Sequence, residues 1–278
     1  MQVSGEADKE CKVKTEILRG KTALVTGASS GLGTDFARQL AECGCHLVLV
    51  ARREERLREL AADISTRYGV SVECVAMDLV CPDAPQRLYD QLKDAGRTID
   101  ILINNAGLGL FGEFSAVPWE STRQMLGIDM IAVTHLTRLF MAGMLERRYG
   151  HILFLSSIGA FQPTPTYAAY SAAKSYILSF GEALHYELRG TGVQCTVLCP
   201  GVTRTEFLSV AGQRPTPYQR MTMMESGVVA RIGIKAMLKG RSSVVTGWFS
   251  AFFAWATRFM PRQALAGLAY QAMRELPR

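Results

Sequence analysis

The sequence has little of what a metal site needs. It contains only four histidines among 278 residues, and its seven cysteines are an odd number. The close pairs Cys43/Cys45 and Cys195/Cys199 have neither tetrahedral-site spacing nor histidine partners. We therefore expect no metal. Because most cysteines, Cys74 among them, lie in or beside apolar segments, we interpret them as reduced, buried thiols of a cytosolic-type compartment.

Signals for nucleic-acid binding, secretion and membrane spanning are also missing. No run of five lysines and arginines occurs, and the formal net charge is +6, which favours a solvated basic surface or a site for an anionic ligand over nucleic acid. The first twenty residues carry charges of both signs and lack the apolar core of a signal peptide. No stretch contains the roughly 20 apolar residues that a membrane-spanning helix needs. We expect a cytoplasmic protein.

Apolar runs typical of buried strands alternate with segments of helical periodicity. Such alternation predicts an α/β fold, a doubly wound parallel sheet with helices on both faces. No linker divides it, so we predict one domain, residues 20–278, after a frayed polar leader, residues 1–19. The expected strands are residues 21–26, 46–51, 70–79, 99–104, 151–155, 193–199 and 243–246. The expected helices are residues 34–43, 54–68, 84–95, 119–148 with a bend near Gly127, 166–189 and 228–238.

A glycine-rich turn follows the first expected strand. It reads Thr26-Gly27-Ala28-Ser29-Ser30-Gly31-Leu32-Gly33. Glycines let the backbone approach a pyrophosphate, and the helix after the turn presents free N–H groups and a partial positive charge. The spacing is not G-x-G-x-x-G, and an ordinary tight turn is the alternative. The position between a first strand and a helix favours phosphate binding.

Two arginines end the second expected strand, in Ala51-Arg52-Arg53. Sites that prefer NAD place an acidic residue there for the ribose 2′-hydroxyl, whereas this chain has no carboxylate before Glu54. A guanidinium suits the 2′-phosphate of NADP through charge-assisted bonds. The alternative is a pair of solvated arginines that open a helix. We predict NADP(H) as cofactor, in preference to NAD(H).

A tyrosine and a lysine, Tyr170 and Lys174, share one face of the helix expected at residues 166–189. Ser157 follows the strand expected at residues 151–155. A hydroxyl, a phenol and an ammonium that converge form a plausible proton-transfer site. Taken alone, the tyrosine and lysine spacing more often belongs to a packing residue beside a solvated charge.

Six motifs at the ends of successive strands together resemble those of the short-chain dehydrogenase/reductase family, in its short single-domain branch. They span about residues 20–205, and the resemblance implies a Rossmann-type seven-stranded sheet that binds a nicotinamide cofactor. The motifs are the glycine turn, Asp78-Leu79, Asn104-Asn105-Ala106-Gly107, Ser157, Tyr170-x-x-x-Lys174 and Pro200-Gly201-Val202-Thr203-Arg204-Thr205.

The resemblance also assigns cofactor contacts. The glycine turn, with Gly27, Ser29, Ser30 and Leu32, would line the pyrophosphate. Asp78 would take the adenine amino group, residues 105–107 would lie along the ribose, and residues 200–205 would hold the nicotinamide end. The family is commonly dimeric or tetrameric, here through the helices expected at 119–148 and 166–189, so we expect a homodimer or homotetramer.

The reaction expected from this match is hydride transfer between the cofactor and a carbonyl or secondary alcohol. Tyr170 would be the acid in reduction and the base in oxidation. A free phenol has a pKa of about 10, and we expect the ammonium of Lys174 to lower the pKa of Tyr170. Lys174 would also bond the nicotinamide ribose, and Ser157 would orient the substrate oxygen. The alternative for Ser157 is a strand-end serine that bonds its own backbone.

Asp129 departs from the family pattern, which usually has an asparagine at the matching position of the long helix. An asparagine side chain donates and accepts, whereas an ionised aspartate only accepts. With a water bridging Asp129 to Lys174, we expect activity with an altered pH profile and include Asp129 among the catalytic residues. Two alternatives stay open: a regulatory module that binds NADP(H) without turnover, or a helix offset that leaves Asp129 as a cap or ion-pair residue.

The expected substrate lid, residues 201–226, is rich in apolar side chains, and its methionines suit an adaptable pocket. We predict an apolar carbonyl or alcohol substrate of the steroid, 3-oxoacyl or aryl ketone type. The lid residues are Phe207, Leu208, Val210, Pro215, Pro217, Tyr218, Met221, Met223 and Met224, and the further walls are Leu108, Leu110, Phe111, Phe161, Pro163 and Pro165.

An apolar helical tail, residues 247–278, closes the chain and includes Trp248, Phe252 and Trp255. We consider a subunit interface, a flap over the pocket and an in-plane membrane contact, in that order of preference.

Overall fold

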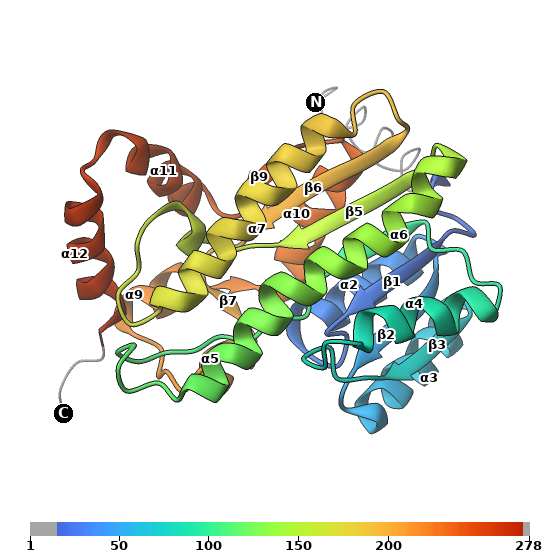
Figure 1. Ribbon diagram of the computed structural model, residues 1–278, viewed down its shortest axis with the longest axis horizontal. Helices are drawn as coiled ribbons and strands as arrows, with labels where there is room; N and C mark the ends of the chain where they lie inside the picture. The colour runs from blue at the N-terminus through green and yellow to red at the C-terminus, as the bar shows by residue number, and fades with distance from the viewer. Residues whose placement is uncertain (1–15, 275–278) are drawn as a thin grey trace, which may run out of the picture.

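A seven-stranded parallel sheet forms the centre of the computed structural model, which describes residues 16–274 (Figure 1). The strand order is β3-β2-β1-β4-β5-β6-β9, and all neighbouring strands pair in parallel. The Rossmann-type fold expected from the sequence is therefore confirmed. The strands are β1 (Thr22–Thr26), β2 (His46–Ala51), β3 (Val72–Ala76), β4 (Ile101–Asn104), β5 (Gly150–Leu155), β6 (Val193–Cys199) and β9 (Ser243–Val245).

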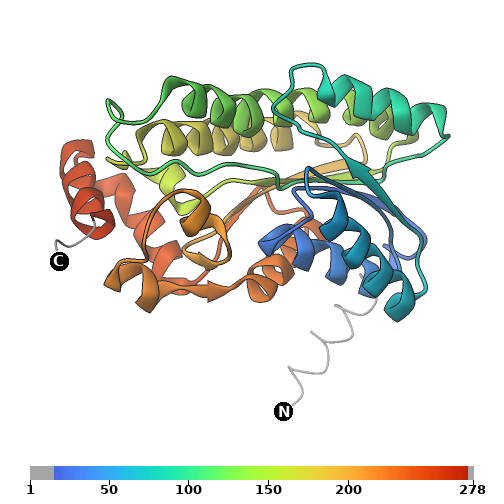
Figure 2. The same cartoon turned by 90° about the horizontal axis from the view of Figure 1, so that it is seen from below.

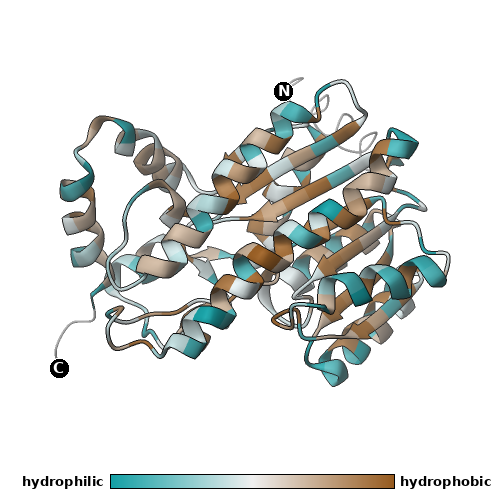
Figure 3. Ribbon diagram, viewed as in Figure 1, coloured by the Kyte–Doolittle hydropathy of each residue, from teal (hydrophilic) through white to brown (hydrophobic). Residues whose placement is uncertain are grey.

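Helices cover both faces of this sheet (Figure 2). Along β2, Leu47 and Leu49 belong to one hydrophobic core, and Val48 and Val50 belong to the other, because successive side chains of a strand point to opposite faces. Both faces are thus apolar, and Figure 3 shows the strands as the most hydrophobic part of the protein. The first layer holds α2 (Gly31–Glu42), α3 (Glu54–Tyr68) and α10 (Ser226–Leu238), and the second holds α4 (Ala84–Asp94), α5 (Trp119–Leu126), α6 (Val133–Arg147) and α7 (Ala168–Glu187).

The helix expected at residues 119–148 is interrupted by a π-helical turn, η1 (Gly127–Ala132), between α5 and α6. Such wide turns often occur at functional sites, and this one holds Asp129, which is fully buried. Contrary to the expectation that no stretch is long and apolar enough to cross a membrane, the run Trp119–Arg147 is so by length and composition. Here its apolar face packs on the sheet, since Leu136, Phe140 and Met144 belong to the second core.

Two irregular regions follow the strands on the carboxyl side of the sheet. The lid consists of β7 (Thr203–Arg204), α8 (Phe207–Val210), α9 (Pro217–Thr222) and β8 (Met224–Glu225), and a short 3-10 turn, η2 (Ile158–Phe161), lies after β5. An arm projects from the same end of the molecule in both views (Figures 1 and 2). It consists of α11 (Trp248–Ala256), the 3-10 turn η3 (Thr257–Phe259) and α12 (Arg262–Met273).

Some boundaries differ from those expected. The third strand ends at Ala76 rather than Leu79, because the chain leaves the sheet there to line a cavity. The predicted leader, residues 1–19, lies mostly outside the described residues. Leu18, from its last part, is fully buried in the first core, where its carbonyl accepts a hydrogen bond from Cys45. Burial raises the pKa of the Cys45 thiol to about 12.

Gly181 marks the place where α7 crosses the sheet, and we expect Gly181→Ala to destabilise the fold. A Cβ atom there would lie 2.3 Å from Cγ2 of Val197 and 3.0 Å from Cδ2 of Phe154. The overpacking should lower the free energy of unfolding by about 1–3 kcal/mol. The higher helix propensity of alanine should offset about 1 kcal/mol of that loss. Urea-induced unfolding measures the difference.

Gly143→Ala in α6 is the matched control. Its Cβ would meet only the guanidinium of Arg147, at 3.0 Å, a group that also donates to the carbonyl oxygen of Ile99. Because this long side chain can shift by a few tenths of an ångström, the variant should be about as stable as the wild type. Equal losses of stability in the two variants would contradict the packing argument.

Candidate active site

A cavity of about 390 Å³ opens at the carboxyl ends of the strands, beneath the lid. The connections from β1 and β4 diverge there, and clefts form at such switch points in strand order. Among the residues predicted for the site, Gly33 and Asp129 lie outside the lining. Those that line the cavity are Gly27, Ser29, Ser30, Gly31, Leu32, Arg52, Arg53, Asp78, Leu79, Asn105, Ala106, Gly107, Ser157, Tyr170, Lys174, Pro200, Gly201, Val202, Thr203 and Thr205.

The glycine turn presents bare backbone to this cavity. Gly27 and Gly31 have positive φ angles, of 67° and 54°, which glycine adopts without a steric cost. A Cβ at Gly33 would lie 2.2 Å from the carbonyl oxygen of Gly27, so this glycine closes the turn from behind. The turn leads into α2, whose first turn carries no acidic side chain. Its free N–H groups therefore suit a phosphate.

The segment after β4 holds the turn in place. The hydroxyl of Thr26 accepts hydrogen bonds from the backbone N–H groups of Asn105 and Ala106, both at 3.0 Å. The Asn105 side chain donates to the carbonyl oxygen of Thr26 at 2.8 Å. These bonds link two neighbouring strand ends, so the residues predicted for the pyrophosphate and for the ribose form one rigid wall.

Ser157 and Tyr170 meet on the opposite wall. The Ser157 hydroxyl accepts a hydrogen bond from the backbone N–H of Gly159 at 3.1 Å and also bonds the Tyr170 hydroxyl. The structure thus shows the bond to the local backbone, and the same hydroxyl faces Tyr170 because a hydroxyl both accepts and donates. The orienting role of Ser157 toward a substrate oxygen stays a prediction. The Tyr170 ring packs 5.3 Å from the ring of Phe207 in the lid.

Behind this wall, Asp129 and Lys174 form a buried ion pair. Oδ2 of Asp129 lies 3.1 Å from Nζ of Lys174, and the two side chains are 0% and 6% exposed. Oδ1 of Asp129 accepts from the backbone N–H of Leu108 at 2.8 Å, and Nζ of Lys174 donates to the carbonyl oxygen of Leu155 at 3.1 Å. Burial raises the pKa of the Asp129 carboxyl, while Lys174 and the Leu108 amide oppose that shift.

The ion pair changes the electrostatics expected for Tyr170. Burial raises the pKa of the phenol, the Asp129 carboxylate raises it further, and only the hydrogen bond with Ser157 lowers it. The net shift is upward, opposite to the direction expected from the sequence, and Lys174 is not among the groups that cause it. Because Lys174 lies against a carboxylate, its positive charge is largely compensated and does little to stabilise a phenolate.

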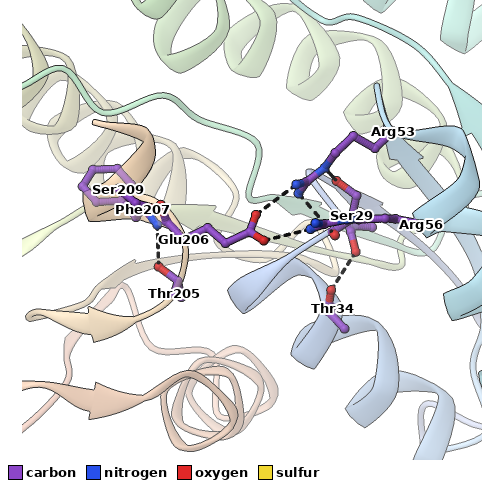
Figure 4. Close-up of polar contacts among 9 residues, drawn as sticks. Ser29, Thr34, Arg53, Arg56, Thr205, Glu206, Phe207 and Ser209 are labelled. Carbon is purple, nitrogen blue, oxygen red and sulfur yellow. Dashed lines mark hydrogen bonds and ion pairs between the residues drawn. The ribbon is translucent and has the colours of Figure 1, made fainter. Parts of the chain in front are cut away.

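At the other end of the cavity, the lid is fastened to the arginines that follow β2 (Figure 4). The Glu206 carboxylate accepts a hydrogen bond from Arg53 at 2.9 Å and one from Arg56 at 2.8 Å. Arg53 also donates to the Ser29 hydroxyl at 3.1 Å. The bonds from Arg56 and Arg53 lower the pKa of Glu206 to about 2. We name this contact the Glu206 clasp; no spacing rule in the sequence indicated it.

The lid end of the cavity is more polar than the sequence predicted. Leu108, Phe207, Leu208 and Val210 line it as expected, but the other predicted walls do not. Gln162 and Thr164 face inward in place of Phe161, Pro163 and Pro165, since alternate side chains of an extended segment point to opposite sides. Tyr167 donates to Oε1 of Gln213 at 2.7 Å, and Gln219, which lines the cavity, donates to the same oxygen at 2.8 Å.

Comparison with known proteins points to one family. The sequence model of the short chain dehydrogenase family matches residues 21–215 of this chain. The very-long-chain 3-oxoacyl-CoA reductase of Anas platyrhynchos is 30% identical over 267 residues, which cover 92% of this chain and 81% of that protein.

Solved structures agree. A short-chain dehydrogenase from Sphingobium yanoikuyae in complex with NADPH is 30% identical, with a TM-score of 0.79 over 92% of this chain and 98% of that one. A short chain dehydrogenase/reductase from Burkholderia phymatum in complex with NAD is 25% identical, with a TM-score of 0.78 over 94% of this chain and 99% of that one.

Replacing Glu206 by glutamine should loosen the lid. Hydrogen–deuterium exchange at the backbone amides of Val210 and Ala211 is expected to accelerate, because their helix loses its link to Arg53 and Arg56. Both partners of the Arg53 pair are more than 40% exposed, so high salt should accelerate exchange in the wild type as well. Because the carboxyl pKa is lowered, the clasp should hold above pH 4.5 and be lost as the pH falls through about 2.

Glu225→Gln serves as the control for this variant. Glu225 belongs to the same lid and pairs with Arg204 at 2.8 Å, away from the cavity. Equal exchange in the two variants would show that the Glu206 clasp does not hold the lid.

Proposed function

The chain belongs to the short-chain dehydrogenase family, and on that premise we propose that it is an NADP(H)-dependent oxidoreductase that interconverts a carbonyl and a secondary alcohol on an apolar substrate. One observation carries the proposal: Ser157, Tyr170 and Lys174 line the same cavity as the glycine turn. A hydride carrier bound along the turn and a proton donor on the opposite wall would then share one enclosed space.

Tyr170 is the proton donor in this proposal. A bound nicotinamide supplies or accepts the hydride, and the phenol of Tyr170 gives its proton to the substrate oxygen as the carbonyl becomes an alcohol. The phenol is protonated at neutral pH, as the acid role in reduction requires, although its raised pKa also makes it a weaker acid. Ser157 holds the substrate oxygen beside the phenol through the hydroxyl that already bonds Tyr170.

Lys174 is held in place by Asp129. An ammonium has three N–H donors, and two of them go to Asp129 and to the carbonyl oxygen of Leu155. The third is left for the cavity, where it would bond the cofactor ribose. Gly107 makes room for this arrangement, since a Cβ there would lie 2.9 Å from Oδ1 of Asp129 and 3.3 Å from Nζ of Lys174.

The arginines after β2 support NADP(H). Arg53 lies beside Ser29 at this corner of the cavity and binds Glu206, so it would take the 2′-phosphate in exchange for that carboxylate. Arg52 is exposed at the same rim. The relative from Sphingobium was solved with NADPH and that from Burkholderia with NAD, and the absence of an acidic residue at positions 51–53 favours the former.

For the substrate we favour an acyl chain that carries a 3-oxo group. The relative from Anas platyrhynchos is named for a very-long-chain 3-oxoacyl-CoA, and Phe207, Leu208 and Val210 provide apolar contacts. Gln162 and Gln219 would bind polar groups near the reacting carbonyl. Steroids and aryl ketones are the other candidates. The alternative function is a module that binds NADP(H) without turnover. The observation that speaks for this alternative is the pairing of Lys174 with Asp129.

The direct test is NADPH oxidation with a panel that contains a 3-oxoacyl thioester, a steroid ketone and an aryl ketone. We expect turnover with at least one compound and slower turnover with NADH. Tyr170→Phe should keep NADPH binding, measured by fluorescence, and lower kcat by about 10²–10⁴-fold, because the acid is lost.

Tyr176→Phe is the matched control for Tyr170→Phe. Tyr176 lies on the same helix outside the cavity lining and bonds Thr134, so this variant should stay close to wild-type activity. Tight NADPH binding without turnover on any compound would support the regulatory module instead.

The Asp129→Asn variant tests the role of the ion pair. The carboxylate raises the pKa of Tyr170, so its removal should shift the limb of the pH–rate profile that reports this phenol to lower pH. The profile is best measured for alcohol oxidation, in which the phenolate is the base. An unchanged profile would show that Asp129 does not act on the proton transfer.

A further inference from the structure

The arm exposes large aromatic side chains. Trp248 is 84% exposed, Phe252 60% and Trp255 54%. These three are spaced i, i+4 and i+7 along α11, so they share one face of the helix. Phe259 follows in η3, is 72% exposed, and its ring lies 5.0 Å from that of Trp255. We call these four side chains the aromatic strip.

The inner face of α11 is made of small side chains. Its buried residues are Ser250 and Ala254, and Ser250 packs so closely on Gly201 that a Cβ there would lie 2.5 Å from the serine hydroxyl. A surface helix of a soluble protein normally buries its large apolar side chains and exposes polar ones. α11 has no charged residue and does the reverse, which indicates that its outer face contacts something apolar.

The charged side chains of the arm have one sign. Residues 247–274 contain three arginines, Arg258, Arg262 and Arg274, and no lysine, aspartate or glutamate. Arg258 and Arg262 are exposed and flank Phe259 in the turn that joins α11 to α12. A surface that is both apolar and negatively charged would therefore complement the aromatic strip and these two arginines.

We propose that the arm docks on the surface of a lipid bilayer that contains anionic lipids. The aromatic strip would enter the interface between headgroups and acyl chains, and Arg258 and Arg262 would contact the negative headgroups. Tryptophan suits this depth because its ring is apolar and its N–H is polar. A second copy of the chain, docked arm to arm, would instead bring like charges together with no carboxylate on either arm to compensate them.

The arm also borders the cavity. Met273, the last residue of α12, is part of the lining. Its carbonyl oxygen accepts a hydrogen bond from Gln213 of the lid at 2.8 Å, and Thr216 donates to the carbonyl oxygen of Ala272 at 3.1 Å. A docked arm would therefore hold the cavity rim at the lipid surface, where apolar substrates dissolve. This delivery of substrate rests on the proposed function, whereas the docking itself does not.

Vesicle binding without substrate or cofactor tests the docking, so its outcome is separate from that of the activity assays. Two of the three tryptophans, Trp248 and Trp255, lie on the strip, and a Trp119→Phe background confines the fluorescence to them. We expect this protein to cosediment with phosphatidylcholine vesicles that contain phosphatidylglycerol, with a blue shift of its emission. High salt should weaken the binding.

Phe252→Gln with Phe259→Gln keeps both reporter tryptophans and should abolish cosedimentation and the blue shift. Tyr186→Gln is the matched control, because Tyr186 is an exposed aromatic residue in the last turn of α7, at the opposite end of the strands. It should bind vesicles as the wild type does. An unchanged melting temperature shows that each variant is folded.

Arg258→Gln with Arg262→Gln separates the charge from the apolar contact. Each arginine near an anionic surface contributes about fivefold in affinity, so binding to the phosphatidylglycerol vesicles should fall by about 25-fold.

Two results would overturn the proposal. One is that the protein does not bind phosphatidylglycerol vesicles at low salt. The other is a stable dimer that the Phe252→Gln and Phe259→Gln substitutions convert to monomers, because the occupant of the strip would then be a second copy of the chain.

Discussion

Parallel pairing of strands that are buried on both faces is the constraint from which the arrangement of this protein follows. Each connection must cross a face of the sheet, here as a helix, so the strands all end at one edge. β1 lies between β2 and β4, and the connections that leave this point in opposite directions open the cavity. The glycine turn, the segment after β4, Ser157 and the segment after β6 meet there because each follows a strand.

Within that frame, the ion pair between Asp129 and Lys174 sets the electrostatics of the inner wall. An isolated buried charge is costly, so each of the two groups depends on the other. The π-helical turn η1 brings Asp129 inward, and Gly107 leaves space for the pair. Burial and the Asp129 carboxylate both raise the pKa of Tyr170, so its phenol is a weaker acid, and its phenolate a stronger base, than the motif alone suggests.

The lid joins parts of the protein that the sheet leaves separate. On one side, Glu206 fastens it to Arg53 and Arg56 through exposed ion pairs, which solvent and salt weaken. On the other side, Gln213 fastens it to the end of α12 through a buried amide. The corner beside Arg53, the lid end of the cavity and the arm are thus joined through one element. A contact made by the arm at a lipid surface would therefore affect the position of the cavity rim, through the hydrogen bond from Gln213 to the carbonyl oxygen of Met273.

Local signals in the sequence determined much of this protein. Continuous apolar runs specified the strands, helical periodicity specified the covering helices, and the glycine turn with the Tyr170 and Lys174 spacing located the cavity wall. These features depend on near neighbours along the chain, so they can be recognised without a structure.

The inward turn of Gln162, the Glu206 clasp and the pairing of Asp129 with Lys174 were decided only by the tertiary structure. Arg53 and Glu206 are 153 residues apart in sequence, and the direction of the Tyr170 pKa shift depends on burial and on a carboxylate from another helix. Charge interactions act through space and strengthen where water is excluded. The spacing of residues along the chain specifies neither the distance between two charged groups in the fold nor the exclusion of water around them.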